Sequence, residues 1–202
     1  MVAGKLIILA SSSPRRRLLL KKLGFKVKVF HPKIKEKRKF GETPKKMVKR
    51  LAIEKGVYTL KKIGSFKTAT ILLSADTIVV APDQKTILGK PKNINAAKKM
   101  LTILSGKTHQ VLTGYCLLLF NFKKNNSQKT ITRVVSSRVK IKKLSKAVIS
   151  KYVNTKEPYD KAGAYAAQGK ASRFIDKIYG SYTNVVGLPV EKLLEDIKRL
   201  IV

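Results

Sequence analysis

The stretch KLIILASSSPRRRLLLKKLG at residues 5–24, followed by FKVKVF at 25–30, decides the class of fold. Residues 5–10 form a short apolar run that is typical of a buried strand. The serines and Pro14 of SSSP are the residue types that begin a helix, and Gly24 is suited to end it. Apolar and polar residues alternate in 25–30, which predicts a half-buried strand. A strand, a helix and a strand in immediate succession indicate an α/β protein.

The rest of the chain continues this alternation of helices and strands. Further strands are expected at 69–76, directly afterwards at 77–82, and at 107–120 and 129–141. Further helices are expected from Thr43-Pro44 onward, from Asn93 or Asn95 to Ser105, over 145–153 and from Pro189 to the end. The turn-like segment 121–128 predicts a hairpin between the last two strands. We therefore expect a mixed, partly antiparallel sheet flanked by helices.

Length and patterning bound the organisation of the protein. The 202 residues contain no repeat and no linker rich in proline, glycine or serine, so a single domain over residues 1–202 is expected. The longest apolar runs, such as Leu6–Ala10, are far shorter than the roughly 20 residues that span a bilayer. The single cysteine, Cys116, lies in an apolar run and is expected to be buried. We expect a cytoplasmic protein with no cleaved leader and no membrane association.

The charge of the chain is unusual. Lys and Arg number 45 against 11 acidic residues, a formal net charge of +34. Such a chain attracts polyanions, including nucleic acids and phosphorylated small molecules. The basic residues are mostly lysines spread over the whole length, a pattern that favours nonspecific adhesion over the reading of bases. We therefore expect only nonspecific contact with nucleic acid.

The first candidate site is SSSPRRR at residues 11–17, between the first strand and the first helix. Backbone N–H groups at a helix N-terminus bind anions, and Ser13, Arg15 and Arg16 would add donors that grip a phosphate. The alternative is a capped helix whose basic first turn is solvated. That alternative is weakened because the positive end of a helix disfavours cations unless an anion compensates them.

The second candidate is Asp76, at the end of the run ILLSAD. Strand ends in α/β sheets open into ligand crevices, and a carboxylate there can hold a divalent cation or activate water. An ordinary turn aspartate is equally compatible with the residues. Lys90, in GKP, could supply an ammonium group to a leaving phosphate.

The third candidate is EPYDKAGAYAAQG at residues 157–169, followed by GSYTNVVGLP at 180–189. Small residues allow a close approach of the backbone, and the amide of Gln168 could pair with the edge of a base. Gly180, Asn184 and Gly187 of the second run are expected to serve turn structure. The two histidines, His31 and His109, are far apart and form no zinc-binding pattern.

The ordered motifs LASSSPRR, SADT, GKP, SGKTHQVLTG, EPYDKAGAYAAQG and GSYTNVVGLP resemble those of the Maf family of nucleoside triphosphate pyrophosphatases. The resemblance runs from Lys5 to the final helix. It implies a mixed, strongly curved sheet like that of inosine triphosphate pyrophosphatases, and commonly a cytoplasmic homodimer. It also implies hydrolysis of a nucleoside triphosphate between the α and β phosphorus atoms with Mg²⁺ or Mn²⁺, giving the monophosphate and pyrophosphate.

The resemblance also assigns roles to individual residues. Asp76 matches the proton acceptor of the family, Arg16 a phosphate-binding arginine, and the further charged site residues are Glu36, Lys55 and Lys90. The positions that separate subfamilies are Arg15, Thr77 and Gln168, and these residue types resemble the dTTP/UTP branch. Glu36 and Asp76 would hold the metal. Whether Asp76 acts as base or as metal ligand stays open at this point.

One motif departs from the pattern of the family. The loop before Glu36 is often acid-rich, whereas this chain has Lys33 and Lys35 there. Lost acids weaken a metal site, and added lysines can compete for phosphate. Two function classes therefore remain: a dTTP/UTP pyrophosphatase, and a non-catalytic polyanion-binding or cell-division-regulating protein on the same fold.

Overall fold

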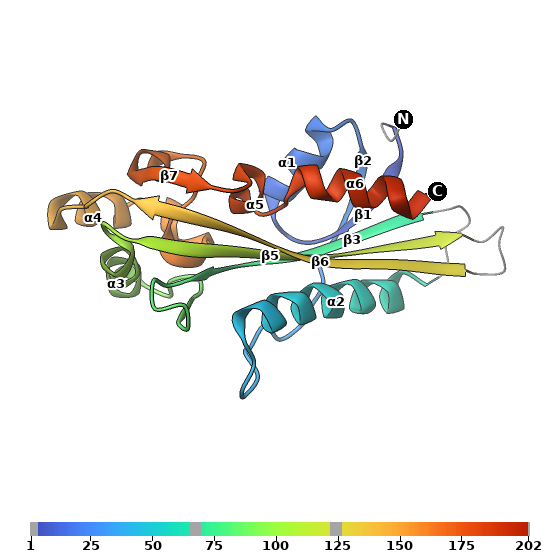
Figure 1. Ribbon diagram of the computed structural model, residues 1–202, viewed down its shortest axis with the longest axis horizontal. Helices are drawn as coiled ribbons and strands as arrows, with labels where there is room; N and C mark the ends of the chain where they lie inside the picture. The colour runs from blue at the N-terminus through green and yellow to red at the C-terminus, as the bar shows by residue number, and fades with distance from the viewer. Residues whose placement is uncertain (1–3, 65–69, 122–126, 202) are drawn as a thin grey trace. The chain divides into compact units, whose positions relative to one another are not determined.

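The computed structural model describes residues 4–64, 70–121 and 127–201 (Figure 1). The strands are β1 (Leu6–Ala10), β2 (Lys26–Phe30), β3 (Thr70–Val80), β4 (Ile87–Leu88), β5 (Thr108–Asn121), β6 (Ser127–Ile141) and β7 (Ile175–Tyr179). The α-helices are α1 (Pro14–Lys22), α2 (Pro44–Ile63), α3 (Ile94–Leu104), α4 (Lys146–Val153), α5 (Tyr182–Val186) and α6 (Val190–Ile201). Three short 3₁₀ helices lie between α4 and β7.

The strands form one mixed sheet, as the sequence predicts. Its order is β2-β1-β3-β5-β6-β7, with β4 paired to β3. The pairs β1–β2 and β1–β3 are parallel, whereas β3–β4 and β6–β7 are antiparallel. The strand–helix–strand stretch at residues 5–30 thus forms the parallel edge of the sheet.

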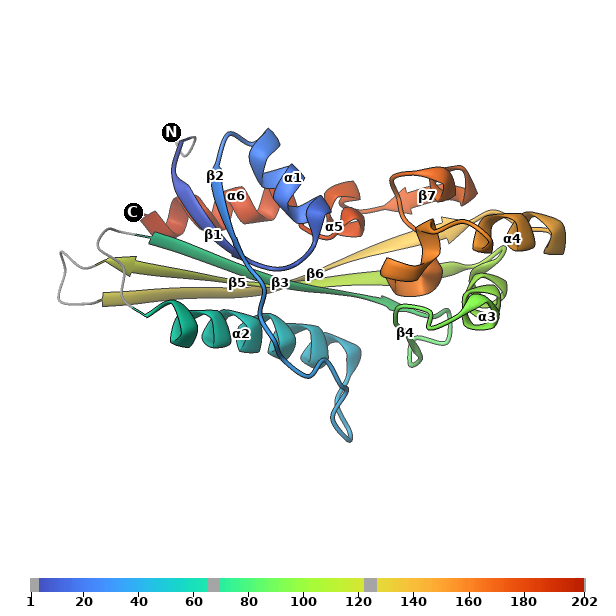
Figure 2. The ribbon, with the colours of Figure 1, turned by 180° about the vertical axis from the view of Figure 1, so that it is seen from behind.

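The chain divides into two compact units. The first comprises residues 1–76, 113–134 and 187–202, and the second comprises 77–112 and 135–186. In the first unit α2 lies on one side of the strands and α6 on the other (Figure 2). Buried residues of β1, α2, β3 and β5 pack together there, among them Ile8, Ala52, Leu72 and Cys116. Cys116 is 2% exposed, which confirms that it is a core residue.

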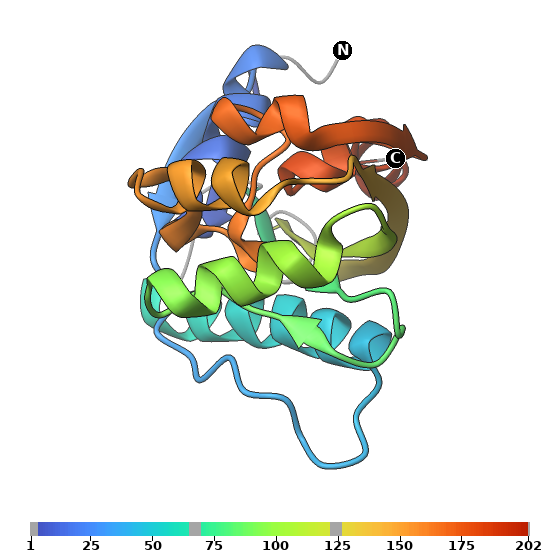
Figure 3. The ribbon, with the colours of Figure 1, turned by 90° about the vertical axis from the view of Figure 1, so that its left-hand side faces the viewer.

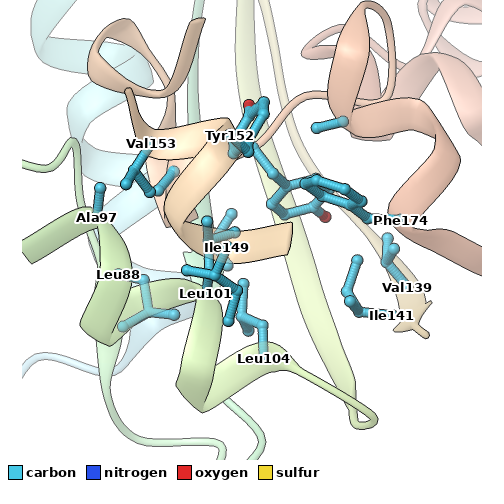
Figure 4. Close-up of a cluster of buried hydrophobic side chains, with 14 of the residues drawn as sticks. Leu88, Ala97, Leu101, Leu104, Val139, Ile141, Ile149, Tyr152, Val153 and Phe174 are labelled. Carbon is cyan, nitrogen blue, oxygen red and sulfur yellow. The ribbon is translucent and has the colours of Figure 1, made fainter. Parts of the chain in front are cut away.

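The second unit has its own core. Helix α3 packs against α4 (Figure 3). Figure 4 shows the cluster of apolar side chains that these helices share with β6 and the loop before β7. Tyr152 and Phe174 meet edge to face within it, with ring centroids 5.0 Å apart. This core holds the long segment between α4 and α5 in place.

The expected elements are largely present, with some differences. The two strands expected at 69–76 and 77–82 are one continuous strand, β3. The region after α4 contains β7 and α5, which are not among the elements expected from the sequence. The expected hairpin turn falls mostly on residues 122–126, outside the described residues. Among the described helices, none is long and apolar enough to cross a membrane.

Candidate active site

The central feature of the first unit is a lysine between two carboxylates. Lys55 Nζ lies 2.6 Å from Asp76 Oδ1 and 2.7 Å from Glu36 Oε1. Lys55 and Asp76 are buried, whereas the side chain of Glu36 is about half exposed. Three of the charged residues that the resemblance assigns to the site thus meet, although they are far apart in the sequence. Glu36 stands at the solvent side of the cluster.

Small residues allow α2 to bring Lys55 to Asp76. A Cβ atom at Gly56 would lie 2.9 Å from Ser74 Oγ, so only glycine permits this approach of helix to strand. Ser74 Oγ donates a hydrogen bond of 2.6 Å to the carbonyl of Ala52, one turn earlier in α2. Gly114 has the same function on β5, where a Cβ would lie 2.5 Å from the carbonyl oxygen of Val48. The position of Lys55 therefore depends on its neighbours Gly56 and Ser74.

Asp76 does not lie at a strand end, and the expectation that it does was wrong. It lies within β3, which runs on to Val80. The apolar run TIVV continues the strand because Ile78, Val79 and Val80 are themselves buried. It is the neighbouring strand that ends: β1 pairs with β3 only as far as Ala10 opposite Ser74. The pairing of β1 with β3 therefore stops two residues before Asp76.

The N-terminus of α1 begins where β1 ends. Ser13 is the N-cap, and its side chain accepts a hydrogen bond of 3.5 Å from the backbone N–H of Arg16. Ser11 Oγ accepts another, of 3.2 Å, from the backbone N–H of Ser13. Pro14 occupies the first turn, as predicted. This turn provides the oriented N–H groups and hydroxyls that anions bind at a helix N-terminus.

Arg16 is buried and contacts the protein itself. Its Nε donates to the carbonyl of Gly187, and its Nη1 donates to the carbonyl of Ala75 and to Ser11 Oγ, each at 2.8 Å. Burial lowers the pKa of the guanidinium, and the charge of Asp76 raises it. Arg16 therefore ties α1 to β3 and to the Gly187 turn. Arg15, the neighbouring residue, is half-buried.

A second ion pair holds the loop that carries Glu36. Arg50 Nε lies 2.7 Å from Glu42 Oε1, and Arg50 Nη2 donates to the other carboxylate oxygen at 2.8 Å. The hydrogen bonds from Arg50 lower the pKa of Glu42 to about 2. Arg50 Nη2 also donates to the carbonyl of Lys37, next to Glu36. The loop between β2 and α2 is thereby fastened to α2.

The remaining predicted site residues belong to the second unit. Thr77 is half-buried on β3, Lys90 is exposed in the loop after β4, and Gln168 is exposed in the loop before the last 3₁₀ helix. The loop after β4 is joined to the second 3₁₀ helix, Ala162–Ala164, because the N–H of Gly163 donates to the carbonyl of Gly89 at 3.1 Å. The roles of Thr77, Lys90 and Gln168 toward a substrate stay predictions.

The carboxylates of the first unit suit one type of metal site. Among the described residues there is no group of three or more His, Cys, Asp or Glu side chains that could hold a metal. Mg²⁺, however, is commonly held by one or two carboxylates together with water and substrate phosphates. Glu36 and Asp76 provide two such carboxylates, and their convergence on one ammonium shows that they can approach the same cation. The residues fit a metal that arrives with a phosphate.

Sequence reasoning missed several residues that support this site. The sequence gives no signal for Arg50 and Glu42, because their pairing spans a loop that has no periodic pattern. Gly187 was interpreted as turn chemistry; its φ of +125° agrees with that, but its carbonyl also accepts from Arg16. Asn184, expected to serve turn structure, lies within α5 instead, and its buried amide donates to the carbonyl of Val111 and to Ser137 Oγ on β5 and β6.

Comparison with known proteins finds relatives of this chain over nearly its whole length. The chain is 42% identical to a dTTP/UTP pyrophosphatase of Photorhabdus laumondii, over 92% of this chain and 89% of that protein. It is 44% identical to a dTTP/UTP pyrophosphatase of Alkaliphilus oremlandii (94% and 93% covered) and 43% identical to one of Pyrococcus abyssi (96% and 95%). Among solved structures it aligns with the Ham1 protein of Staphylococcus aureus over 96% of this chain and 98% of that one, at 14% identity and a TM-score of 0.40. Residues 6–200 match the family described as Maf-like protein, and the chain belongs to that family.

Proposed function

We propose that this protein is a nucleoside triphosphate pyrophosphatase that converts dTTP or UTP to the monophosphate and pyrophosphate. The observation that carries the proposal is the cluster of Lys55, Asp76 and Glu36. Relatives at 42–44% identity over nearly the whole chain carry the name of this activity. The homodimer and the cytoplasmic location that the resemblance implies are part of the proposal.

The charged residues would act on the triphosphate by electrostatics. Negative charge grows on the phosphate oxygens as the bond between the α and β phosphorus atoms breaks, and fixed cations stabilise it. Lys55 is held in place for this by its two carboxylates. Arg15, beside the N-terminus of α1, would add a further cation, and Ser13 and the backbone N–H groups of that turn would bind phosphate oxygens. Arg16 would act mainly by fixing the turn, since protein carbonyls accept its hydrogen bonds.

Asp76 would be the proton acceptor. A general base must reach the attacking water, and Asp76 lies beside Lys55, two residues beyond the last pairing of β1 with β3. Glu36 and Asp76 would also hold Mg²⁺ or Mn²⁺, which supplies charge neutralisation of the phosphates when bound. Lys55 contacts one oxygen of each of these carboxylates. Lys90, Thr77 and Gln168 are assigned to the substrate by the resemblance alone.

The experiment that tests the function is a panel of triphosphates. The purified protein is incubated with UTP, dTTP, CTP, GTP and ATP, with Mg²⁺ and with Mn²⁺, and pyrophosphate and orthophosphate are measured separately. Release of pyrophosphate with the monophosphate, fastest from UTP or dTTP, is the expected result. Release of orthophosphate would indicate cleavage at the γ position and contradict the proposal.

A non-catalytic polyanion-binding protein is the competing candidate, and the net charge of +34 favours it. Failure to turn over any nucleotide, together with retention on a polyanion such as heparin, would support it. The same panel therefore separates the two functions.

A further inference from the structure

Glu157 binds the backbone of a loop that lies more than ten residues further along the chain. Its Oε2 accepts a hydrogen bond of 2.8 Å from the N–H of Lys170, and its Oε1 accepts one of 3.0 Å from the N–H of Ala171. Tyr152 donates its hydroxyl to the same Oε1 at 3.2 Å. One half-buried carboxylate thus takes three donors, two of them main-chain groups of a single turn.

The geometry shows that this turn is formed around the carboxylate. Lys170–Phe174 is a 3₁₀ helix whose N-cap, Gly169, has no side chain to cap it. Glu157 supplies the missing acceptor and places negative charge at the helix N-terminus, where it is favourable. Gly169 has a φ of +104°, and a Cβ there would lie 3.0 Å from both carboxylate oxygens. Only glycine permits this contact.

Gln168 is the residue directly before this turn. The residue is exposed, so packing of its side chain does not hold Gln168 in place. The loop is fastened earlier by Tyr165, whose hydroxyl lies 2.7 Å from His109 Nε2, and more weakly by the carbonyl of Ala167, which accepts from Tyr182 at 3.4 Å. On the C-terminal side of Gln168, the loop is held by Glu157. The backbone of Gln168 is therefore held between two anchors.

We propose that Glu157 is a positioning residue for Gln168, and that through Gln168 it sets the preference for pyrimidine over purine triphosphates. The inference rests on the proposed function, in which the Gln168 amide pairs with the edge of the base. An exposed amide on a loose loop would hydrogen-bond to water as readily as to a base. A misplacement of about 1 Å at such a contact can cost on the order of a hundredfold in rate, so the carboxylate anchor has a direct effect on discrimination.

The test is a double-mutant cycle on the ratio of kcat/KM for UTP to that for GTP. Glu157→Gln keeps the shape but presents an NH₂ group to one of the two main-chain N–H donors. We expect the ratio to fall by on the order of tenfold in Glu157→Gln, within the range of a displaced contact. In the Gln168→Ala background the same change should lower the ratio by less than about twofold, because residues that act as a unit are non-additive.

Two controls complete the experiment. Glu195→Gln removes an equal charge from an exposed position on α6 and should leave the ratio unchanged. Thermal unfolding of each variant measures any loss of stability. An equal fall of kcat/KM for both nucleotides, with an unchanged ratio, would overturn the inference and leave Glu157 a structural residue. Additive effects in the cycle would overturn it as well. Wild-type protein that releases no pyrophosphate from any triphosphate would overturn the proposed function itself, and the inference with it.

Discussion

Lys55 Nζ lies 2.6 Å from Asp76 Oδ1, and each of these side chains is only 8% exposed. Two opposite charges removed from water in this way each lose hydration, and their mutual attraction must compensate for it. Glu36 adds a second negative group at 2.7 Å, so the single ammonium faces two carboxylates. With two carboxylates and one ammonium, the cluster can accept further positive charge that arrives with a substrate. Its members therefore affect both chemistry and stability.

Asp76→Asn tests the effect of this cluster on the chemistry. The substitution keeps the shape of the side chain and removes its charge and basicity. We expect turnover to fall by at least about a hundredfold, the range found for general bases. Pyrophosphate release at saturating UTP measures it, with Asp176→Asn as the matched change at an exposed carboxylate. Near-normal turnover in Asp76→Asn would contradict the mechanism.

Lys55→Met tests the contribution of the same pair to stability. The change removes the ammonium and leaves Asp76 buried without it, a loss that typically costs about 3–5 kcal/mol. Urea unfolding of the variant should show a reduced free energy of unfolding with an unchanged m-value. Lys192→Met removes the lysine of an exposed pair with Glu195, and should cost no more than about 1 kcal/mol. Equal effects of the two substitutions would show that the buried pair has no special weight.

The dependence of KM on salt reports whether the many lysines act on the substrate. A chain with a net charge of +34 attracts a triphosphate over long distances at low ionic strength. Screening shortens this range to about 8 Å at physiological salt. We expect KM for UTP to rise as potassium chloride is increased, while kcat changes little. A KM that stays flat from low to high salt would show that the diffuse lysines do not assist binding.

Most of the fold could be predicted from local patterns. The first strand, the capped helix after it and the final helix follow from apolar spacing and from Ser13, Pro14 and Gly24. Strand β7 and helix α5 were missed because their segments are short, and few of their residues show a buried face. Such elements form because the surrounding core holds them, and single-sequence patterns do not carry that information.

The candidate site, too, could be predicted only in part from local patterns. A motif indicated Asp76, and the family resemblance assigned Lys55 and Glu36 to the site. Their convergence, however, depends on Gly56 lying against Ser74, a contact between distant segments. Asp196 is a further example. It is fully buried on the core face of α6 and accepts hydrogen bonds from Tyr115 and Arg133 at 2.6 Å. A buried charge becomes plausible only when its partners on other strands are known.

Gln168→Ala tests the choice of base apart from the chemistry. An amide donates and accepts at once, which suits the alternating donor and acceptor edge of uracil or thymine. A lost hydrogen bond that leaves a buried partner unpaired costs about 1–3 kcal/mol, or roughly five- to a hundredfold in kcat/KM. The UTP-to-GTP ratio should therefore shrink while pyrophosphate release persists. Gln84→Ala, at an exposed turn, is the control. A general loss of rate with an unchanged ratio would place Gln168 in catalysis or folding instead.

His109 makes the stability of the second unit depend on pH. Its ring is 2% exposed, Nε2 lies 2.7 Å from the Tyr165 hydroxyl, and Nδ1 has no hydrogen-bond partner within the described part of the chain. Burial lowers the pKa of His109 to about 4, against about 6.5 for an unperturbed histidine. In the folded protein the ring is therefore neutral at pH 6, whereas in the unfolded chain it is largely protonated.

The sign of the effect follows from this difference. Between about pH 6.5 and 4 the unfolded state binds more protons, so the free energy of unfolding falls as the pH falls, by about 3 kcal/mol over that range. Above pH 6.5 His109 contributes no slope. Urea unfolding at several pH values should show a shallower acid slope in His109→Gln than in the wild type, since the acidic residues titrate equally in both. His31→Gln, at an exposed histidine, should keep the wild-type slope. Parallel slopes in His109→Gln and the wild type would mean that His109 takes up its proton as readily in the folded state as in the unfolded one.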